Sequence, residues 1–328
     1  MLGRVRRKRR VLSFLLLGFL IAVNALLILL LLRQGPVTAE PASQDLTVNP
    51  TASPSSTSTP TLNATPSNPP TRSPKSLPAE KKQPGVIPTN RLLIAESAHV
   101  AWRATVGDCK TAGKIERSTN GGESWKVAVK KSGLARIVQL GIEEAAGNLY
   151  AVGGSSQDCS ARYIAYSRSG AVVAQTEGPQ GVWFLNPGDS DQVFGPGNAK
   201  ATPCKNQHVI SLAALDNSRA LVICTGGSVA TTSNGGGAWK KVGSLPGTMA
   251  VTAAQSRYWA AGSAKACDGV AVRALGVAGD RLSLAKSQCA KKAKLTAGQV
   301  ALGGSGKAIW LWAGDKVRVS TNGGRSWT

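Results

Sequence analysis

An eight-residue phrase occurs three times in this chain and constrains its fold more than any other feature. It reads Ser-Thr-Asn-Gly-Gly-Glu-Ser-Trp at 118–125, Thr-Ser-Asn-Gly-Gly-Gly-Ala-Trp at 232–239 and Ser-Thr-Asn-Gly-Gly-Arg-Ser-Trp at 320–327. Asn-Gly is typical of two-residue hairpin turns because both residues tolerate positive φ. The hydroxyl residue is expected to end one strand, and the Trp to begin the return strand with a large apolar surface. A phrase that recurs at wide spacing predicts a repeat architecture.

The spacing of the phrase is compatible with propeller blades. Successive Trp residues are 114 and 88 residues apart, and units of roughly 40–50 residues, typical of four-stranded blades, fill both intervals. Eroded copies occupy 163–170 and 270–280, and 181–195 is interpreted as half of a further unit. We therefore predict that residues 91–328 form an all-β propeller of about five to six blades. A β-sandwich with coincidental turns is the alternative.

The phrase resembles the Asp-box, or BNR repeat, of sialidase-like β-propellers, whose pattern is Ser-x-Asp-x-Gly-x-Thr-Trp. Asn replaces the Asp in all three copies, which preserves a side-chain-to-backbone hydrogen bond in the turn. The layout also resembles bacterial membrane-anchored BNR-repeat proteins and, distantly, the photosystem II assembly factor propellers. The positions that match the pattern are structural: Ser118, Asn120, Gly122, Trp125, Thr232, Asn234, Gly236, Trp239, Ser320, Asn322, Gly324 and Trp327.

The last repeat is expected to be completed from the other end of the domain. Thr328 directly follows the final Trp of the phrase, which leaves no room for a return strand. Residues 91–95, Arg-Leu-Leu-Ile-Ala, are predicted to supply a strand to the final blade, because such closure removes an exposed sheet edge.

The N-terminal residues predict a membrane anchor. Residues 1–10 contain six basic residues and no acidic one, and 11–32 contain no charge. About 20 apolar residues span a hydrocarbon core of roughly 30 Å, and the basic flank stays cytoplasmic. We expect a single-pass signal anchor at the cell membrane with an extracellular C-terminal domain. A cleaved signal peptide ending near 37–39 is the alternative, although its apolar core would be unusually long.

Residues 33–90 are predicted to be a disordered linker. They are rich in Pro, Ser and Thr and contain few branched or aromatic apolar residues. Such a composition buries too little apolar surface to fold and favours an extended chain.

The cysteines agree with an oxidising compartment. All six lie in the predicted propeller, and an even number there favours disulfides. Fifteen pairings exist for six cysteines, and local order suggests Cys109–Cys159, Cys204–Cys224 and Cys267–Cys289. No metal site is predicted, because the chain has no Cys-x-x-Cys and its histidines, His99 and His208, are isolated.

The charge distribution predicts anionic partners. Of the net charge of +22, residues 1–33 contribute +7, residues 34–90 contribute +1 and residues 91–328 contribute +14. A basic domain outside a membrane attracts lipid head groups and anionic wall polymers. Clusters of lysine at 130–131, 240–241 and 291–294 are candidate contacts. Nucleic acid is not favoured, because basic residues are not interleaved with aromatic ones.

The residues do not favour catalysis. The resemblance to sialidases implies an arginine triad, a Tyr/Glu nucleophile pair and an acid Asp, yet no Tyr/Phe-Arg-Ile-Pro motif precedes the first phrase, where 101–104 reads Ala-Trp-Arg-Ala. The acidic pairs 143–144 and 189/191 lie in loop contexts, and the four tyrosines, Tyr150, Tyr163, Tyr166 and Tyr258, lie in strand-like runs. We predict no catalytic residue and no cofactor.

Two functional hypotheses follow. The first is a non-catalytic, membrane-tethered extracytoplasmic module that binds or scaffolds a protein or an anionic cell-envelope ligand. The alternative is a divergent sialidase-like glycoside hydrolase that has lost or altered the usual motifs.

Overall fold

The computed structural model describes residues 88–143 and 145–328, and every element of regular structure in these ranges is a β-strand. The predicted cytoplasmic segment 1–10, the predicted anchor 11–32 and nearly all of the predicted linker 33–90 lie outside the described residues. Within the described ranges, no helix of a length and hydropathy suited to crossing a membrane is present.

The strands pair antiparallel into six sheets, here called blades 1 to 6 in chain order. Blade 1 contains β1 (Arg91–Ala95), β2 (Ala101–Thr105), β3 (Ile115–Ser118) and β4 (Lys126–Val129). Blade 2 contains β5 (Ile137–Ile142), β6 (Leu149–Gly154), β7 (Ala161–Tyr166) and β8 (Val172–Glu177). Blade 3 contains β9 (Phe184–Leu185), β10 (Val193–Phe194) and β11 (Lys200–Ala201).

The second half of the domain supplies the other three blades. Blade 4 contains β12 (Val209–Ala214), β13 (Ala220–Cys224), β14 (Ser228–Thr232) and β15 (Lys240–Ser244). Blade 5 contains β16 (Thr248–Ala254), β17 (Arg257–Gly262), β18 (Gly269–Ala278), β19 (Arg281–Leu284) and β20 (Gln288–Lys291), the last pairing with β18. Blade 6 contains β21 (Val300–Ser305), β22 (Ala308–Ala313) and β23 (Lys316–Ser320).

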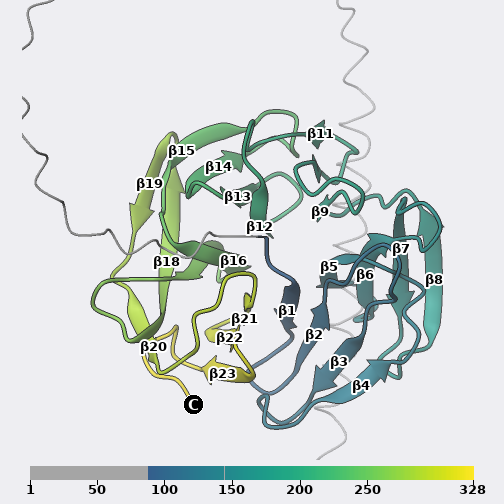
Figure 1. Ribbon diagram of the computed structural model, residues 1–328, viewed down its shortest axis with the longest axis horizontal. Helices are drawn as coiled ribbons and strands as arrows, with labels where there is room; N and C mark the ends of the chain where they lie inside the picture. Colours follow the sequence, from purple (N-terminus) through teal and green to yellow (C-terminus); the bar gives the residue numbers. More distant parts are fainter. Residues whose placement is uncertain (1–87, 144) are drawn as a thin grey trace, which may run out of the picture. The chain divides into compact units, whose positions relative to one another are not determined.

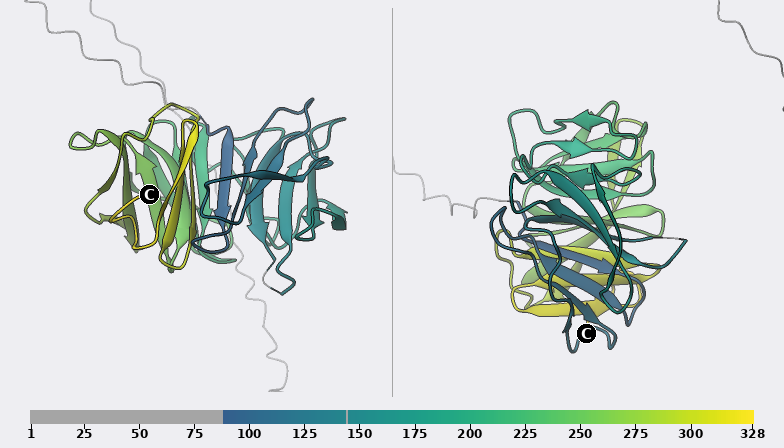
Figure 2. Two further views of the ribbon diagram at one scale, coloured as in Figure 1. Left: turned by 90° about the horizontal axis from the view of Figure 1, so that it is seen from below. Right: turned by 90° about the vertical axis from the view of Figure 1, so that its right-hand side faces the viewer.

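The six blades form a ring (Figure 1), and the strands run between the two faces of that ring (Figure 2). The first strand of each blade lies toward the centre. Contacts join β1 to β5, β5 to β9, β12 to β16, β16 to β21, and β21 back to β1. The fold is therefore a six-bladed β-propeller, within the predicted range, and the β-sandwich alternative is wrong. The half unit expected at 181–195 corresponds to the short strands of blade 3.

The expected closure by residues 91–95 is wrong. β1 is the first strand of its own blade and pairs with β2, from which only five residues, 96–100, separate it. So short a connection favours a local hairpin over pairing with the distant β23. Blade 1 instead packs on blade 6. A Cβ atom on Gly303 would lie 2.9 Å from the Leu93 carbonyl oxygen, so only glycine permits this approach.

Side chains and backbone of blades 1 and 6 hold the closed ring together. Asn90 N donates to Gly298 O at 2.8 Å. The Arg103 guanidinium carbon lies 4.3 Å from the ring centre of Trp125 and 4.8 Å from that of Trp312, while Arg103 Nε donates to Glu116 Oε2 at 2.8 Å. An arginine held between two indoles and bound by a carboxylate is fixed by cation–π attraction and an ion pair together.

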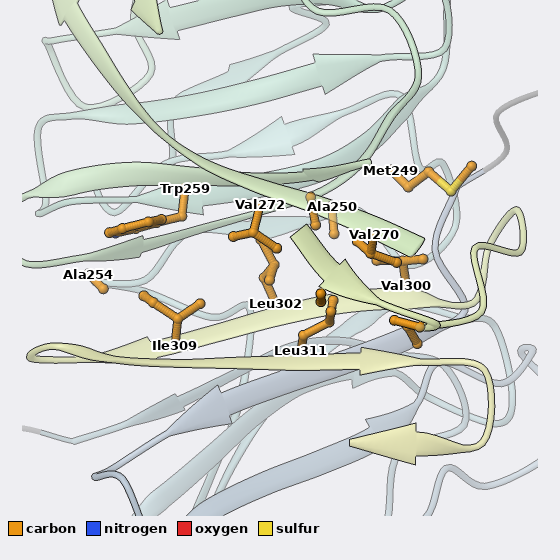
Figure 3. Packing of buried hydrophobic residues seen from close by; sticks show 14 of the residues in the cluster. Met249, Ala250, Ala254, Trp259, Val270, Val272, Val300, Leu302, Ile309 and Leu311 are labelled. Atoms are coloured by element: carbon orange, nitrogen blue, oxygen red, sulfur yellow. The ribbon is translucent and has the colours of Figure 1, made fainter. Parts of the chain in front are cut away.

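The apolar core lies between neighbouring blades rather than within one sheet. Figure 3 shows the layer between blades 5 and 6, where Val272, Leu302, Ile309 and Leu311 meet. All six residues of β22 are buried. A strand covered on both faces reads as a continuous apolar run without alternation, which explains the sequence Ala-Ile-Trp-Leu-Trp-Ala.

The repeated phrase forms the turn that follows the third strand of blades 1, 4 and 6. β3 ends at Ser118, β14 at Thr232 and β23 at Ser320, as expected. The positive φ values, however, belong to the two glycines: Gly121 has φ 73° and Gly122 has φ 88°, and Asn120 is not in this conformation. The expectation that Asn-Gly supplies the pair of positive φ values is therefore wrong, because Gly-Gly adopts them at lower steric cost.

The Asn acts through its side chain. Asn120 Oδ1 accepts from Ser118 Oγ at 3.0 Å and from Ser124 N at 3.1 Å, and Ser118 Oγ accepts from Gly122 N at 2.9 Å. The other two copies repeat this network through Asn234 and Asn322. The amide and the hydroxyl thus satisfy the backbone donors of the turn, as Asx turns do.

Each turn also packs on a tryptophan from the preceding blade. A Cβ atom on Gly122 would lie 3.0 Å from Trp310 of blade 6, and one on Gly236 would lie 3.2 Å from Trp183, next to β9. In the third copy the other glycine makes the contact: a Cβ atom on Gly323 would lie 3.7 Å from Trp259 of blade 5, whereas one on Gly324 would lie 3.7 Å from Trp327 of its own phrase. Trp310 Nε1 donates to Ser97 O at 2.9 Å. We call this arrangement the turn–Trp interlock. The eroded copies at 163–170 and 270–280 form the hairpins β7–β8 and β18–β19.

Three disulfides fasten the loops, in the pairing that local order suggested. Cys109–Cys159 joins the β2–β3 loop of blade 1 to the β6–β7 loop of blade 2. Cys204–Cys224 ties the entry to blade 4 to the end of β13, and Cys267–Cys289 lies within blade 5.

The interlock predicts unequal costs for two adjacent glycines. Gly121→Ala and Gly122→Ala both force a Cβ into the left-handed region, which costs about 1–2 kcal/mol. Only the Cβ at 122 also meets Trp310, whereas the nearest atom to a Cβ at 121 is 3.9 Å away. We expect Gly122→Ala to lose about 1–3 kcal/mol more, measured by urea denaturation. Equal losses for the two variants would show that the Trp contact contributes nothing.

The turn network predicts that Asn120 is replaceable by Asp but not by Val. Asn120→Val removes the acceptor of the Ser118 hydroxyl and of the Ser124 amide, and should cost about 1–3 kcal/mol. Asn120→Asp keeps both acceptors and should change the free energy of unfolding by less than about 0.5 kcal/mol. Thermal melting of both variants checks the difference, and an Asp variant as unstable as the Val variant would contradict it.

Candidate functional site

The first strands of the blades surround a central cavity of about 540 Å³. Residues from β1, β5, β9, β12, β16 and β21 line it, together with the segment just before β9. The lining is mostly aliphatic, and its charged members are Arg91, Arg136 and Asp216. The volume falls within the range of small-ligand pockets, which is about 300–1,000 Å³.

The protein already uses the charges of this cavity. Arg136 Nη1 donates to the Pro187 carbonyl at 2.9 Å. Arg91 lies over Trp312, 4.4 Å from the ring centre, and donates to the Gly314 carbonyl. Asp216 accepts from Arg219 Nε at 2.7 Å, and the hydrogen bonds from Arg219 and nearby backbone amides lower its pKa.

The cavity offers no pair of carboxylates for glycoside hydrolysis among the described residues. Retaining glycosidases hold two carboxyl groups about 5–5.5 Å apart across the scissile bond, and Asp216 is the one carboxylate of the described lining. The arrangement therefore lacks the acid and nucleophile that such a reaction requires.

Tyr163 and Glu143 make a contact just outside this lining, to which the neighbouring Tyr150 belongs. Tyr163 OH donates to Glu143 Oε1 at 2.6 Å, and the ring of Tyr163 stacks on Tyr150 with 5.3 Å between centres. Burial, followed by the charge of Glu143, raises the pKa of Tyr150 to about 12, and burial followed by the Glu143 hydrogen bond raises that of Tyr163. Both tyrosines therefore stay protonated at neutral pH and act as packing and hydrogen-bonding groups.

The other singled-out polar residues do not converge either. His99 is exposed in the β1–β2 loop, and His208 Nδ1 lies 2.8 Å from Asp191 Oδ1. Asp191 and Asp189 belong to the β9–β10 loop, where Asp189 accepts from Gln192 Nε2 at 2.5 Å. Across 88–143 and 145–328, His, Cys, Asp and Glu side chains form no group of three or more that could hold a metal ion.

The distribution of charge around the ring is the strongest functional signal of the domain. Residues 91–239 contain fourteen basic and eleven acidic residues, whereas residues 240–328 contain fourteen basic and only three acidic ones. The excess of +14 is thus concentrated as +11 on β15 and blades 5 and 6. This difference in net charge between the two halves can be read from the sequence, but the net charge of the whole domain conceals it.

Most basic residues of this half lack an acidic neighbour. Within the described ranges, Lys240, paired with Asp280, is the one basic residue after 239 that forms an ion pair. In the first half, Arg103, Lys114, Arg117, Arg162 and Arg219 all do. Unpaired exposed charges leave a positive field available to a partner.

Five exposed lysines of blades 5 and 6 lie in or beside loops that contact one another, together with the exposed Asp268 and Asp315. Lys292 N donates to Asp268 O at 2.8 Å, which joins the end of β20 to the β17–β18 loop. The Lys294 side chain lies against Gly314 of the β22–β23 turn. We call this group the basic edge; it consists of Lys265, Lys291, Lys292, Lys294 and Lys316.

Comparison with known proteins finds distant structural similarity and no match in sequence. No family model matches the chain, and no curated protein matches it. A solved Aleuria aurantia lectin, described as a six-bladed β-propeller, is 10% identical with a TM-score of 0.46, covering 74% of this chain and 96% of its own. YCF48 bound to a D1 peptide is 15% identical with a TM-score of 0.36, covering 77% and 86%. A nidogen/laminin complex is 12% identical with a TM-score of 0.40, covering 60% and 78%.

Proposed function

We propose that this protein is a non-catalytic binding module that holds an anionic cell-envelope polymer through the basic half of its propeller. The observation that carries the proposal is the net charge of +11 on residues 240–328, almost all of it without ion-pair partners in the described ranges. A polyanion gains affinity from such a surface by releasing its condensed counterions.

The proposed location rests on the sequence. The uncharged segment 11–32 behind a basic cluster is a membrane anchor with the propeller on the outer face. The three disulfides are compatible with this side, because disulfides persist in oxidising compartments. Anionic wall polymers are the abundant polyanions there, and the Pro/Ser/Thr-rich linker lets the propeller reach them.

A binding role fits the described chemistry better than hydrolysis. The central cavity has one carboxylate in its described lining, and that carboxylate is bonded to Arg219. The tyrosines near Glu143 have raised pKa values, which disfavours the phenolate that a nucleophile would need.

The proposal predicts salt-sensitive retention on a purified anionic wall polymer. We expect the triple variant Lys291→Gln, Lys292→Gln, Lys294→Gln to bind more weakly at low salt. The slope of log affinity against log salt should fall by about one for each polymer contact that is lost. Affinity chromatography at several salt concentrations measures both quantities.

A control variant with the same change of charge separates a located site from general attraction. Lys126, Lys130 and Lys131 are exposed, form no ion pair in the described ranges and lie in or next to β4 of blade 1. The variant with all three changed to Gln should retain most of the binding. Equal losses for the two triple variants would contradict the basic edge as the site, and release of soluble sugar from the polymer would favour the hydrolase instead.

A further inference from the structure

A groove of about 730 Å³ lies between blades 4 and 5, beside the turn of the second repeated phrase. It is lined by turn residues and by residues of β14, β15, β17 and β18. Its chemistry is carried by Arg219, Trp239, Lys240, Arg257, Tyr258 and Asp280. This groove is separate from the central cavity, which the first strands surround, although Leu215 borders both.

The turn–Trp interlock is missing at this joint, as it is at every joint where the following blade has no repeated phrase. Leu221 pairs with Thr231, the residue before the hydroxyl of the phrase, as Trp310 pairs with Val319 in blade 6. Leu221 therefore occupies the position of the interlocking Trp in blade 4. Blade 5 has no repeated phrase, and its β18–β19 turn is Gly279-Asp280. Blade 4 therefore lacks the tryptophan of the interlock, and blade 5 lacks its turn.

The side-chain amide donors of Asn234 are released at the same place. In the first and third phrases, Asn120 Nδ2 donates to Ser124 Oγ at 3.0 Å and Asn322 Nδ2 donates to Ser326 Oγ at 2.8 Å. The second phrase has Ala238 in place of this Ser, so Asn234 Nδ2 lacks the corresponding acceptor. Trp239 Nε1 is buried without a partner among the described residues, as is Trp327 Nε1, and it is therefore not available to a ligand.

The charges of the groove add to these donors. Its lining contains three basic residues and one acidic residue. Lys240 is paired with Asp280, and Arg219 with Asp216, whereas Arg257 is exposed and forms no ion pair in the described part of the chain. A planar guanidinium with free donors matches a carboxylate in two-point geometry.

The shape of the groove favours a small saccharide over an extended peptide. A peptide that adds a strand needs a free backbone edge. Of the outer strands β15 and β19, only Lys240 belongs to the lining. The groove presents instead an indole, a buried tyrosine and several hydroxyl groups, a combination of apolar surface and fixed polar groups that suits a ring-shaped ligand. Burial raises the pKa of Tyr258, so its phenol remains a donor at neutral pH.

We propose that the groove between blades 4 and 5 binds an acidic sugar unit, with its ring against Trp239 and Tyr258 and its carboxylate on Arg257. This inference rests on the proposed function and names the unit of the anionic polymer that is recognised. The basic edge supplies sequence-independent attraction, and the groove supplies the selectivity for a carboxylate-bearing sugar.

The test uses the full-length protein in detergent and three probes: a glucuronate-containing disaccharide, a neutral glucose disaccharide and a hexaglutamate peptide. Titrations are followed by calorimetry at elevated salt, where long-range attraction to the basic edge is screened. We expect saturable binding of the acidic disaccharide and at least tenfold weaker binding of the neutral one. Equal affinity for the two disaccharides, or tighter binding of hexaglutamate, would overturn the proposal.

Two variants locate the binding. Arg257→Gln should weaken binding of the acidic disaccharide at least tenfold, whereas Lys286→Gln, an exposed residue of the same blade outside the lining, should leave it unchanged. Ala238→Ser restores the acceptor for Asn234 Nδ2 and should weaken binding several-fold without lowering the melting temperature. No effect of Arg257→Gln would overturn the assignment of the carboxylate.

The polymer assay separates this inference from the function on which it rests. If the protein is retained on the polymer in a salt-sensitive way but does not bind the disaccharide, the proposal for the groove is wrong and the proposed function stands. If the unmodified protein shows no saturable binding in either assay, both proposals are wrong.

Discussion

The contact between a turn glycine and a tryptophan of the preceding blade is the constraint on which this ring depends. Neighbouring blades share no backbone hydrogen-bond ladder, so side-chain packing fixes the angle between them, helped by single hydrogen bonds such as Asn90 N to Gly298 O and by the Cys109–Cys159 disulfide. Gly122 admits Trp310, and Gly236 admits Trp183, because neither glycine carries a Cβ that would fill the space. The side-chain network of Asn120 holds the turn in the shape that keeps its glycine in place. The repeated phrase therefore works as a joint between blades and not only as a hairpin.

The same reasoning explains how the ring closes without a shared strand. Blade 6 is fastened to blade 1 by the interlock of Gly122 with Trp310, by hydrogen bonds such as that from Trp310 Nε1 to Ser97 O, and by Arg103 between two indoles. These contacts are made by side chains that are distant in sequence and near in space. The ring is thus closed between blades 6 and 1 by the same turn–Trp interlock that joins other blades.

The sequence predicted what is local and missed what depends on partners in space. The positions of the turns, the strand ends at Ser118 and Thr232, the all-β class and the disulfide pairing follow from short-range patterns, and the structure agrees with them. The prediction for β1 was wrong because it gave the missing return strand of the last repeat more weight than the short connection to β2, which favours a local hairpin. The groove was not predicted. Leu221 and Ala238 differ from the residues at the equivalent positions of other blades, and these equivalences become known only when the strand pairing is known.

The joint between blades 4 and 5 shows how a repeat architecture can acquire a site. The second phrase still packs on Trp183 through Gly236, but Ala238 leaves Asn234 Nδ2 without the acceptor that the other two phrases supply, so this donor remains beside an open groove. Loss of the joint should weaken the ring locally, yet β16 still packs on β12 and the apolar layer of Ile210, Leu221 and Tyr258 is retained. The apolar layer then stabilises the joint, so the residues at its outer rim are not needed for packing. Residues at the joints of a propeller can either pack against the next blade or contact a ligand. Binding groups are therefore expected at joints that lack the interlock, and the basic half of this ring begins at the joint between blades 4 and 5.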